Sequence, residues 1–415
     1  MNWRMRYERS WGQLGMKFNI WVDCPKVALT ELLSFIVDNR GKTVPTSTRG
    51  WKLIATNCVT NNTLYPVYNK VRYLSLETYE HWFRAHPHPG DILFVNKGTP
   101  GRVCMVPDPV DFCIAQDMIA LRVDEEKIYN KYLFAVLRSR KIQKQIYNMN
   151  VGDVIPHFKK QFLNQLQIPV PSKEIQKLIG DLYFQFSYKM ELNNKINKNL
   201  EQQAQMLFDN FYDSLSGQSC ILLSEMIDIR DGTHDSPKAT EHGYPLVTSK
   251  HLLPFGVDTL SANIISKADY DKVNERSKVN TGDILISMIG TVGLISYVID
   301  SPVEFAIKNV GLFKTSQHPS LDLYILYYLK SKSTTQHIEK CLAGSTQKYI
   351  SLGELRKLPI VVPSPDELAA YNLVVRPIVS EIALLVQENR RLSNLRDTLL
   401  PKLMSGELDV SDLDL

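Results

Sequence analysis

The sequence predicts an α+β protein in which two tandem mixed α/β domains alternate with two long α-helices. Two observations predict this fold. One residue pattern returns after a constant spacing of 192 residues, which indicates an internal repeat. Each globular stretch is then followed by a long run of apolar residues three and four positions apart, the spacing of a helix that packs along one face. We therefore expect the two helices to pair as an antiparallel coiled coil with pseudo-two-fold symmetry.

Composition sets limits on this protein. Its 415 residues suffice for two to four domains, and the net charge of +4 is too small to identify a partner. The six cysteines are scattered, without a Cys-x-x-Cys pair or histidines at ligand spacing, so we expect no disulfide framework and no metal site. No signal-peptide pattern and no run of about 20 apolar residues stands out. We expect a cytoplasmic protein without a membrane segment.

The repeat is clearest in its middle and closing parts. Residues 90–93, Gly-Asp-Ile-Leu, recur as residues 282–285, and Gly98-Thr99-x-Gly101 recurs at 290–293. The same offset holds without a gap to the closing segment 166–172, which recurs as 358–364. Upstream of Gly90 the match needs small gaps, with Gly50 opposite Gly243 and Gly41 opposite Gly232. That divergent stretch is where the two halves are expected to differ in specificity.

Each globular domain is expected to contain the same order of elements. Short apolar runs broken by Gly, Pro, Asn and Asp predict strands and turns in its first part, as at 91–95 and 283–287. A helical spacing follows at about 131–149 and 322–341, and a strand ended by proline closes the domain. The paired glycines at 98 and 101 indicate a tight turn.

Helical periodicity begins after each closing Pro-Ser pair. The expected divisions are an N-terminal extension 1–19, a first domain 20–171, a central helical spacer 172–219, a second domain 220–363 and a C-terminal helical spacer 364–415. The seam is expected to contain Ile179, Leu182, Ile196, Leu200 and Leu207 in the central helix and Ile378, Leu385, Leu392 and Leu399 in the C-terminal helix. The alternative is a helix packed only on its own domain, but two such helices after duplicated domains favour mutual pairing.

Several local strings carry a family resemblance. They are residues 38–43 (Asp-x-Arg-Gly-Lys-Thr), residues 231–234 (Asp-Gly-Thr-His), the duplicated Gly-Asp-Ile-Leu, and the terminal segment 395–408. Together with the alternation of domains and helices, they make the chain from about Val27 to Leu415 resemble the specificity subunit of type I restriction-modification systems, the HsdS family. The terminal string is the most specific of these features.

The resemblance implies a function and a set of partners. Each globular domain would be a target recognition domain that reads one half of a split site in double-stranded DNA. The helices would set the spacing and dock two methyltransferase subunits, with restriction/translocase subunits in the full complex. The chain would be non-catalytic and would bind no cofactor or metal itself; S-adenosylmethionine, ATP and Mg²⁺ would belong to the partner subunits.

Candidate DNA-binding residues are the basic and small polar side chains of the loops, because these groups contact phosphates and base edges. In the first domain they are Arg40, Lys42, Thr43, Arg49, Lys52, Lys97, Arg102, His157, Lys159 and Lys160. In the second they are Arg230, Thr233, His234, Lys238, Lys250, Gln347, Lys348 and Tyr349. Equivalent positions carry different side chains, since Lys348 stands opposite Pro156, so two different half-sites are expected.

Enzyme functions fit the sequence less well. Gly41-Lys42-Thr43 resembles the end of a phosphate-binding loop, but Ile36 stands where that loop needs glycine. A nuclease-like set of Asp108 with residues 125–127 occurs in only one copy, and the methyltransferase Asn/Asp-Pro-Pro-aromatic string does not occur. Two alternatives remain: a scaffold whose duplicated domains bind protein, whose binding would depend little on salt, and a fused restriction enzyme that has lost its catalytic part.

The spacer role makes a testable prediction. Inserting one helical turn after Asn194 should change the length of the non-specific gap in the DNA target and leave both half-sites as they were, because about four residues add one turn of helix. Sequencing of methylated host DNA measures both features. A target with unchanged spacing would contradict the spacer role.

Overall fold

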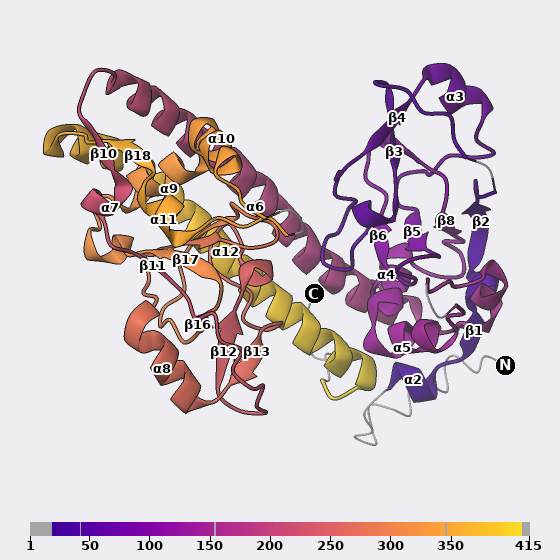
Figure 1. Ribbon diagram of the computed structural model, residues 1–415. Helices are drawn as coiled ribbons and strands as arrows, with labels where there is room; N and C mark the ends of the chain where they lie inside the picture. Colours follow the sequence, from indigo (N-terminus) through magenta and orange to yellow (C-terminus); the bar gives the residue numbers. More distant parts are fainter. Residues whose placement is uncertain (1–18, 42, 153–154, 345–346, 409–415) are drawn as a thin grey trace, which may run out of the picture. The chain divides into compact units, whose positions relative to one another are not determined.

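The computed structural model describes residues 19–41, 43–152, 155–344 and 347–408 (Figure 1). It divides into two compact units. The first contains the described residues up to Asn193 together with those from Glu388 onward, and the second runs from Asn194 to Gln387. The boundary between the units thus falls inside both long helices, so each unit contains one globular domain and one half of each helix. Apart from Asn19, the expected N-terminal extension lies outside the described residues.

The first unit contains three small sheets, because its chain forms short apolar runs separated by turns. The largest is antiparallel, in the order β2 (Leu33–Val37), β8 (Met118–Val123), β5 (Ile92–Val95) and β6 (Val103–Met105). The second has the order β4 (Arg72–Leu74), β3 (Trp51–Ile54) and β7 (Phe112–Ile114), with β7 parallel to β3. The third pairs β1 (Lys26–Ala28) with β9 (Gln167–Pro169). Every residue of β5 is buried, as expected for a central strand with an uninterrupted apolar sequence.

Helices surround these sheets. They are α2 (Ile20–Asp23), α3 (Leu76–His81), α4 (Asn130–Arg138) and α5 (Arg140–Asn148), with 3₁₀ turns η1 (Leu29–Leu32), η2 (Thr56–Cys58) and η3 (Lys160–Gln165). The helical stretch expected over about 131–149 is confirmed, but it is divided into two helices. Ser139 has an extended backbone, with ψ of 144°, and its hydroxyl accepts a hydrogen bond from the Ile142 amide, so it ends α4 and caps α5.

The second unit repeats this architecture. Its four-stranded sheet has the order β11 (Ile229–Asp231), β17 (Val310–Phe313), β14 (Ile284–Ser287) and β15 (Ile295–Tyr297). The smaller sheets are β13 (Asn263–Ile265), β12 (Tyr244–Val247) and β16 (Ala306–Ile307), and β10 (Cys220–Leu222) with β18 (Pro359–Val361). Its short helices are α7 (Leu223–Met226), η4 (Ser249–His251), α8 (Lys267–Ser277), η5 (Thr315–Gln317), α9 (Asp322–Lys330), α10 (Lys332–Lys340) and α11 (Leu352–Arg356). In Figure 1, α8 covers the three-stranded sheet, and it contacts β16.

Strand register confirms the internal repeat. Ile92 pairs with Met105 and Leu121, and Ile284 pairs with Tyr297 and Phe313, so every partner has moved by 192 residues. The expected match between Gly41 and Gly232 is wrong, however. Ile36 pairs with Leu121 and Ile229 pairs with Phe313. The residues that follow each strand are therefore offset by 193, which makes Asp38 the equivalent of Asp231.

Two long helices complete each unit: α6 (Lys173–Ser214) and α12 (Pro365–Ser405). In the first unit the early α6 residue Tyr183 lies under the late α12 residue Arg396, whose guanidinium is 5.5 Å from the ring centroid. In the second, the late α6 residue Phe211 stacks on the early α12 residue Tyr371 at 4.7 Å. The helices therefore run antiparallel within each unit, while the regular side-chain interdigitation of a coiled coil stays a prediction.

Most of the expected seam residues face the protein's own interior. Ile179 and Leu385 are buried, and Leu200, Leu207 and Ile378 pack against the core of the second unit. Leu182, Leu392 and Leu399 are half-buried, and Ile196 is exposed. These side chains can hold the helices in place, but only a small part of their surface is open to another subunit.

Helix α12 is also long and apolar enough to cross a membrane, with a mean hydropathy of 1.5 over 18 residues. A single helix of this kind is weak evidence, because core helices of soluble proteins have the same composition. Here Leu368, Tyr371, Val375, Val379 and Ile382 of α12 belong to the buried core of the second unit. The apolar composition of α12 is thus partly explained by packing.

The duplicated glycine turn allows a matched stability test. Gly101 and Gly293 have φ of +88° and +89°, but a Cβ at Gly101 would lie 2.9 Å from Ile146 Cγ2, whereas at Gly293 it would meet nothing within 4 Å. Gly293→Ala should cost about 1–2 kcal/mol from left-handed backbone strain alone. Gly101→Ala should cost a further ~1–3 kcal/mol through overpacking. Denaturant unfolding of both variants measures the difference, and equal losses would contradict this packing.

Candidate nucleic-acid interface

A polar pocket of about 380 Å³ opens in the first unit beside the duplicated glycine turn. Its lining residues are Arg40, Gly41, Asn96, Lys97, Gln116, Asp117 and His157. Three of these, Arg40, Lys97 and His157, are candidates from widely separated parts of the sequence, and the fold brings them together. Hydrogen-bond donors and acceptors of several kinds therefore converge on one opening.

Backbone hydrogen bonds hold the pocket in shape. The Gly98 amide donates to the Pro156 carbonyl at 3.0 Å, and the Phe158 amide donates to the Asn96 carbonyl at 2.7 Å. His157 and Val151 exchange two further bonds of 2.8 and 2.9 Å. These contacts fix the backbone of His157 from both sides, so its side chain is presented from a rigid frame.

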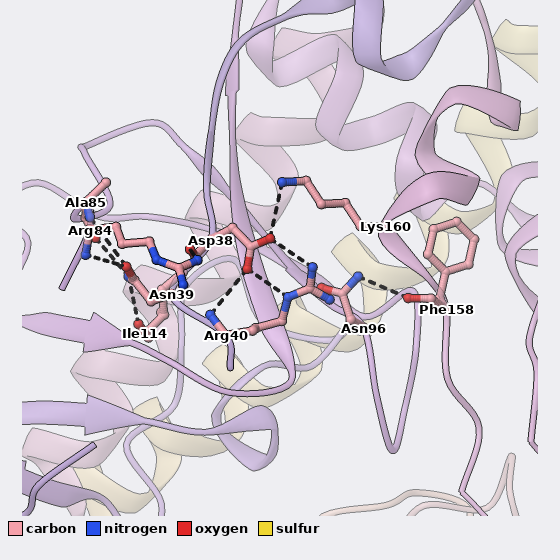
Figure 2. Close-up of polar contacts among 9 residues, drawn as sticks. All are labelled: Asp38, Asn39, Arg40, Arg84, Ala85, Asn96, Ile114, Phe158 and Lys160. Atoms are coloured by element: carbon pink, nitrogen blue, oxygen red, sulfur yellow. Dashed lines mark hydrogen bonds and ion pairs between the residues drawn. The ribbon is translucent and has the colours of Figure 1, made fainter. Parts of the chain in front are cut away.

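Asp38 directly follows β2 and binds two basic side chains, Arg40 in the loop after β2 and Lys160 in η3 (Figure 2). Arg40 donates to both of its carboxylate oxygens, from Nε to Oδ1 at 2.8 Å and from a terminal nitrogen to Oδ2 at 2.9 Å. Lys160 of η3 donates to Oδ2 at 3.2 Å. The Arg40 hydrogen bond is the main reason why the pKa of Asp38 lies well below its usual range. Asp38 is thus an ionised carboxylate shared by two candidate DNA-binding cations.

Asn39 anchors the backbone that carries these residues. Its side-chain amide donates to the carbonyls of Ala85 and Ile114 at 2.8 and 3.1 Å and accepts from the Arg84 amide at 2.9 Å, as Figure 2 shows. The side chain is buried, so these bonds satisfy a polar group that water does not reach. The loop that begins at Asp38 is therefore fixed to two other segments.

The second unit has the same frame with different side chains. The Gly290 amide donates to the Lys348 carbonyl at 3.2 Å, the Ile350 amide donates to the Met288 carbonyl at 3.0 Å, and Tyr349 exchanges two bonds of 2.9 Å with Ala343. Tyr349 pairs with Ile289 as His157 pairs with Lys97. Tyrosine therefore stands in the second unit where histidine stands in the first.

Asp231 lies at the place of Asp38 and also contacts basic side chains. His234 Nε2 lies 3.1 Å from its Oδ2, and Arg276 of α8 forms an ion pair with its Oδ1. The other ring nitrogen of His234 is 2.8 Å from Asn309 Oδ1. Candidate His234 is thus held between Asp231 and Asn309, while Thr233 uses its backbone amide to bond the Ile307 carbonyl.

Other candidates are placed differently. Lys52 is paired with Asp111 and lies 4.2 Å from the ring centroid of Tyr68, and Arg230 is paired with Asp228 at 2.6 Å, so both charges are partly neutralised. Arg102 is half-buried. The exposed candidates are Thr43, Arg49, Lys97, Lys159, Lys160, His234, Lys238, Lys250, Gln347, Lys348 and Tyr349. Lys42 lies outside the described residues.

Asn96, Gln116 and Asp117 line the pocket but were not among the residues predicted from the sequence. Gln116 and Asp117 line the pocket, and Lys308 and Asn309 are their equivalents. Asp117 and Asn309 both have positive φ, of 66° and 53°. Asp and Asn tolerate this conformation best among residues other than glycine, so their recurrence before the strand was a usable signal for a turn.

The chain thus contains two domains of one architecture that differ in the side chains on an equivalent backbone frame. A sequence profile of the type I restriction modification DNA specificity domain matches residues 44–202 and 223–368. The chain belongs to this family. It is a type I restriction-modification specificity subunit, and such subunits recognise DNA sequence and are non-catalytic by themselves.

Known relatives agree with this assignment. The type I restriction enzyme MjaIX specificity subunit of Methanocaldococcus jannaschii is 22% identical over 347 residues, which cover 78% of this chain and 79% of the relative. The HindI specificity subunit of Haemophilus influenzae is 21% identical, with coverage of 77% and 86%. The crystal structure of the S subunit of a type I system from M. genitalium superposes with a TM-score of 0.57 at 16% identity, covering 94% of this chain and 98% of that one. This structural likeness supports the fold.

The lowered pKa of Asp38 predicts a pH dependence of stability. A carboxylate whose pKa is depressed by folding stabilises the protein fully above its unfolded pKa, about 3.9, and loses that contribution as the pH falls toward its folded value. The free energy of unfolding should therefore fall more steeply between pH 5 and pH 3 in the parent chain than in Asp38→Asn. Denaturant titrations at both pH values measure this, and equal slopes would contradict it.

Proposed function

We propose that each globular domain reads one half of a bipartite double-stranded DNA site through its glycine turn and the side chains beside it, which line a pocket in the first unit. The observation that carries this proposal is a backbone frame that is the same in both units while its side chains differ. Lys97, Gln116 and His157 of the first unit are replaced by Ile289, Lys308 and Tyr349 in the second. Two different half-sites would require the same backbone frame to carry different side chains in the two domains.

The side chains in this region suit both kinds of DNA contact. Lysine and arginine bind phosphates, whereas Asn, Gln, Arg and His offer donors and acceptors that match base edges. In the first unit Arg40 and Lys97 line the same pocket as Asn96 and Gln116. Side chains suited to phosphates and side chains suited to base edges therefore occur together. The exposed cations Lys159, Lys160 and Lys348 would add phosphate contacts at the edges of the two sites, and exposed Lys250 would add one elsewhere on the second domain.

We further propose that the long helices set the distance between the half-sites. At 42 residues, α6 spans roughly 63 Å, which is more than one turn of B-DNA. Two methyltransferase subunits would dock on the helical regions, and restriction/translocase subunits would join the complete enzyme. S-adenosylmethionine, ATP and Mg²⁺ would then be bound by those partners, in the cytoplasm, and this chain would bind none of them.

Domain exchange tests the proposal. Replacing residues 27–171 by the equivalent domain of a relative should change one half of the methylated motif and leave the other half and the gap unchanged, because each domain reads independently. The converse exchange of residues 220–363 is the matched control and should change only the opposite half. Methylation mapping gives the motifs. A change in both halves after a single exchange would overturn the modular reading.

A further inference from the structure

We propose that Asp38 and Asp231 are positioning residues that orient the basic side chains of each DNA-reading site. The inference rests on the proposed function, in which the glycine turn and the side chains beside it face DNA in each unit. Neither carboxylate would contact DNA itself. Each would restrict the orientation of neighbouring cations and thereby sharpen the choice of bases in its own half-site.

The contacts of Asp38 leave Arg40 little freedom. The guanidinium is held by two parallel hydrogen bonds of 2.8 and 2.9 Å, the geometry in which arginine and a carboxylate restrict each other most. The same carboxylate binds Lys160, which comes from a segment 122 residues later. Asp38 therefore ties the loop after β2 to η3, and the pocket residue His157 lies just before η3.

The second unit repeats this device with other partners. Asp231 has the same place in the strand register as Asp38, its side chain is only 9% exposed, and it contacts His234 and Arg276. An acidic residue at the end of the strand is thus retained, whereas the basic residues around it differ. Two unequal half-sites would need this combination of one positioning group and different readers.

The residue that follows each aspartate packs against an equivalent strand, β7 in the first unit and β16 in the second. In the first unit the Asn39 side chain bonds the Ile114 carbonyl. In the second, Gly232 takes the place of Asn39, and a Cβ there would lie 2.3 Å from the carbonyl oxygen of Ile307, the residue equivalent to Ile114. The backbones approach too closely for any side chain. Both arrangements set the position of the aspartate before it binds its basic partners.

Exposure separates the ion pairs of Asp231 from the structural ion pairs of the fold. Asp283 and Lys314 form a pair in which the side chains are 0% and 3% exposed. At Asp231, by contrast, the carboxylate is nearly buried while the His234 and Arg276 side chains are 64% and 65% exposed. In the first unit Lys160 at Asp38 is 47% exposed, whereas Arg40 is 23% exposed, close to the 28% of Arg122 in the structural pair with Asp91. Lys160, His234 and Arg276 are therefore the basic partners most accessible to a ligand.

Loss of the carboxylate should lower discrimination between DNA sequences without lowering affinity for DNA. Asp38→Asn keeps the side-chain shape but removes a negative charge and frees Arg40 and Lys160. Affinity for unrelated DNA should then stay the same or rise, because phosphate attraction depends on net positive charge. Discrimination at the first half-site should fall, because a mobile guanidinium no longer requires one base geometry.

The test uses the full chain in complex with its methyltransferase partner, on duplexes that carry the mapped motif with single base changes. Asp38→Asn should reduce discrimination by about tenfold or more at one position or more of the first half-site and leave the second half-site unchanged. Asp231→Asn should do the reverse. The matched control is Asp124→Asn, which removes a carboxylate paired with Lys127 at 2.9 Å, outside the pocket and outside both long helices, and should leave both half-sites as they were.

Other outcomes distinguish a failure of the positioning role of Asp38 from a failure of DNA reading by the pocket. If Arg40→Ala relaxes the first half-site while Asp38→Asn does not, the pocket reads DNA but the positioning role is wrong. If Arg40→Ala changes neither half-site, the proposed function of the pocket itself fails. If Asp38→Asn lowers affinity for cognate and unrelated duplexes equally, or Asp124→Asn relaxes specificity as much, the carboxylate acts through general stability and the inference is overturned.

Discussion

In each unit the structure depends on a hydrogen bond between a glycine turn and a distant segment of the chain. A tight turn with left-handed glycines follows the central strand, and its amide bonds the segment that precedes the closing strand, at Gly98 and Pro156 and again at Gly290 and Lys348. Only glycine adopts this conformation without strain. Because the turn and the segment are far apart in sequence, this contact brings distant polar side chains to one place.

This constraint separates the part of the protein that must stay the same from the part that can change. The frame is built from main-chain hydrogen bonds, which do not depend on the side chains that they carry. His157 can therefore become Tyr349 without altering the turn. Substitutions at the positions that line the pocket therefore need not disturb the fold.

The sequence predicted the elements that depend on repetition and periodicity. The constant offset gave the correct register for β5, β6 and β8 and their equivalents, but not for Ile114, whose equivalent Ile307 is offset by 193. The apolar spacing gave both long helices close to their observed bounds. It did not predict the break at Ser139, because a serine inside an apolar helical pattern can lie within a helix or cap the next one, and only tertiary packing decides between these.

The site was predicted less completely, for a physical reason. Loop composition identified Arg40, Lys97 and the segment near His157 as candidates, but not that they share a pocket, since side-chain convergence depends on the fold of segments far apart in sequence. The basic charges of Lys52 and Arg230 looked available in the sequence, yet Asp111 and Asp228 partly neutralise them. Asp38 was missed as a site residue because acidic groups were not expected at a DNA interface.

The most direct test of the account is methylome sequencing of a host that expresses this chain with its methyltransferase partner, compared with a host that expresses the partner alone. The account predicts a new split motif, with two different half-sites and a fixed gap, that appears only when this chain is present. A stable complex that binds DNA but produces no new motif would contradict the claim that this chain determines the sequence that the enzyme recognises.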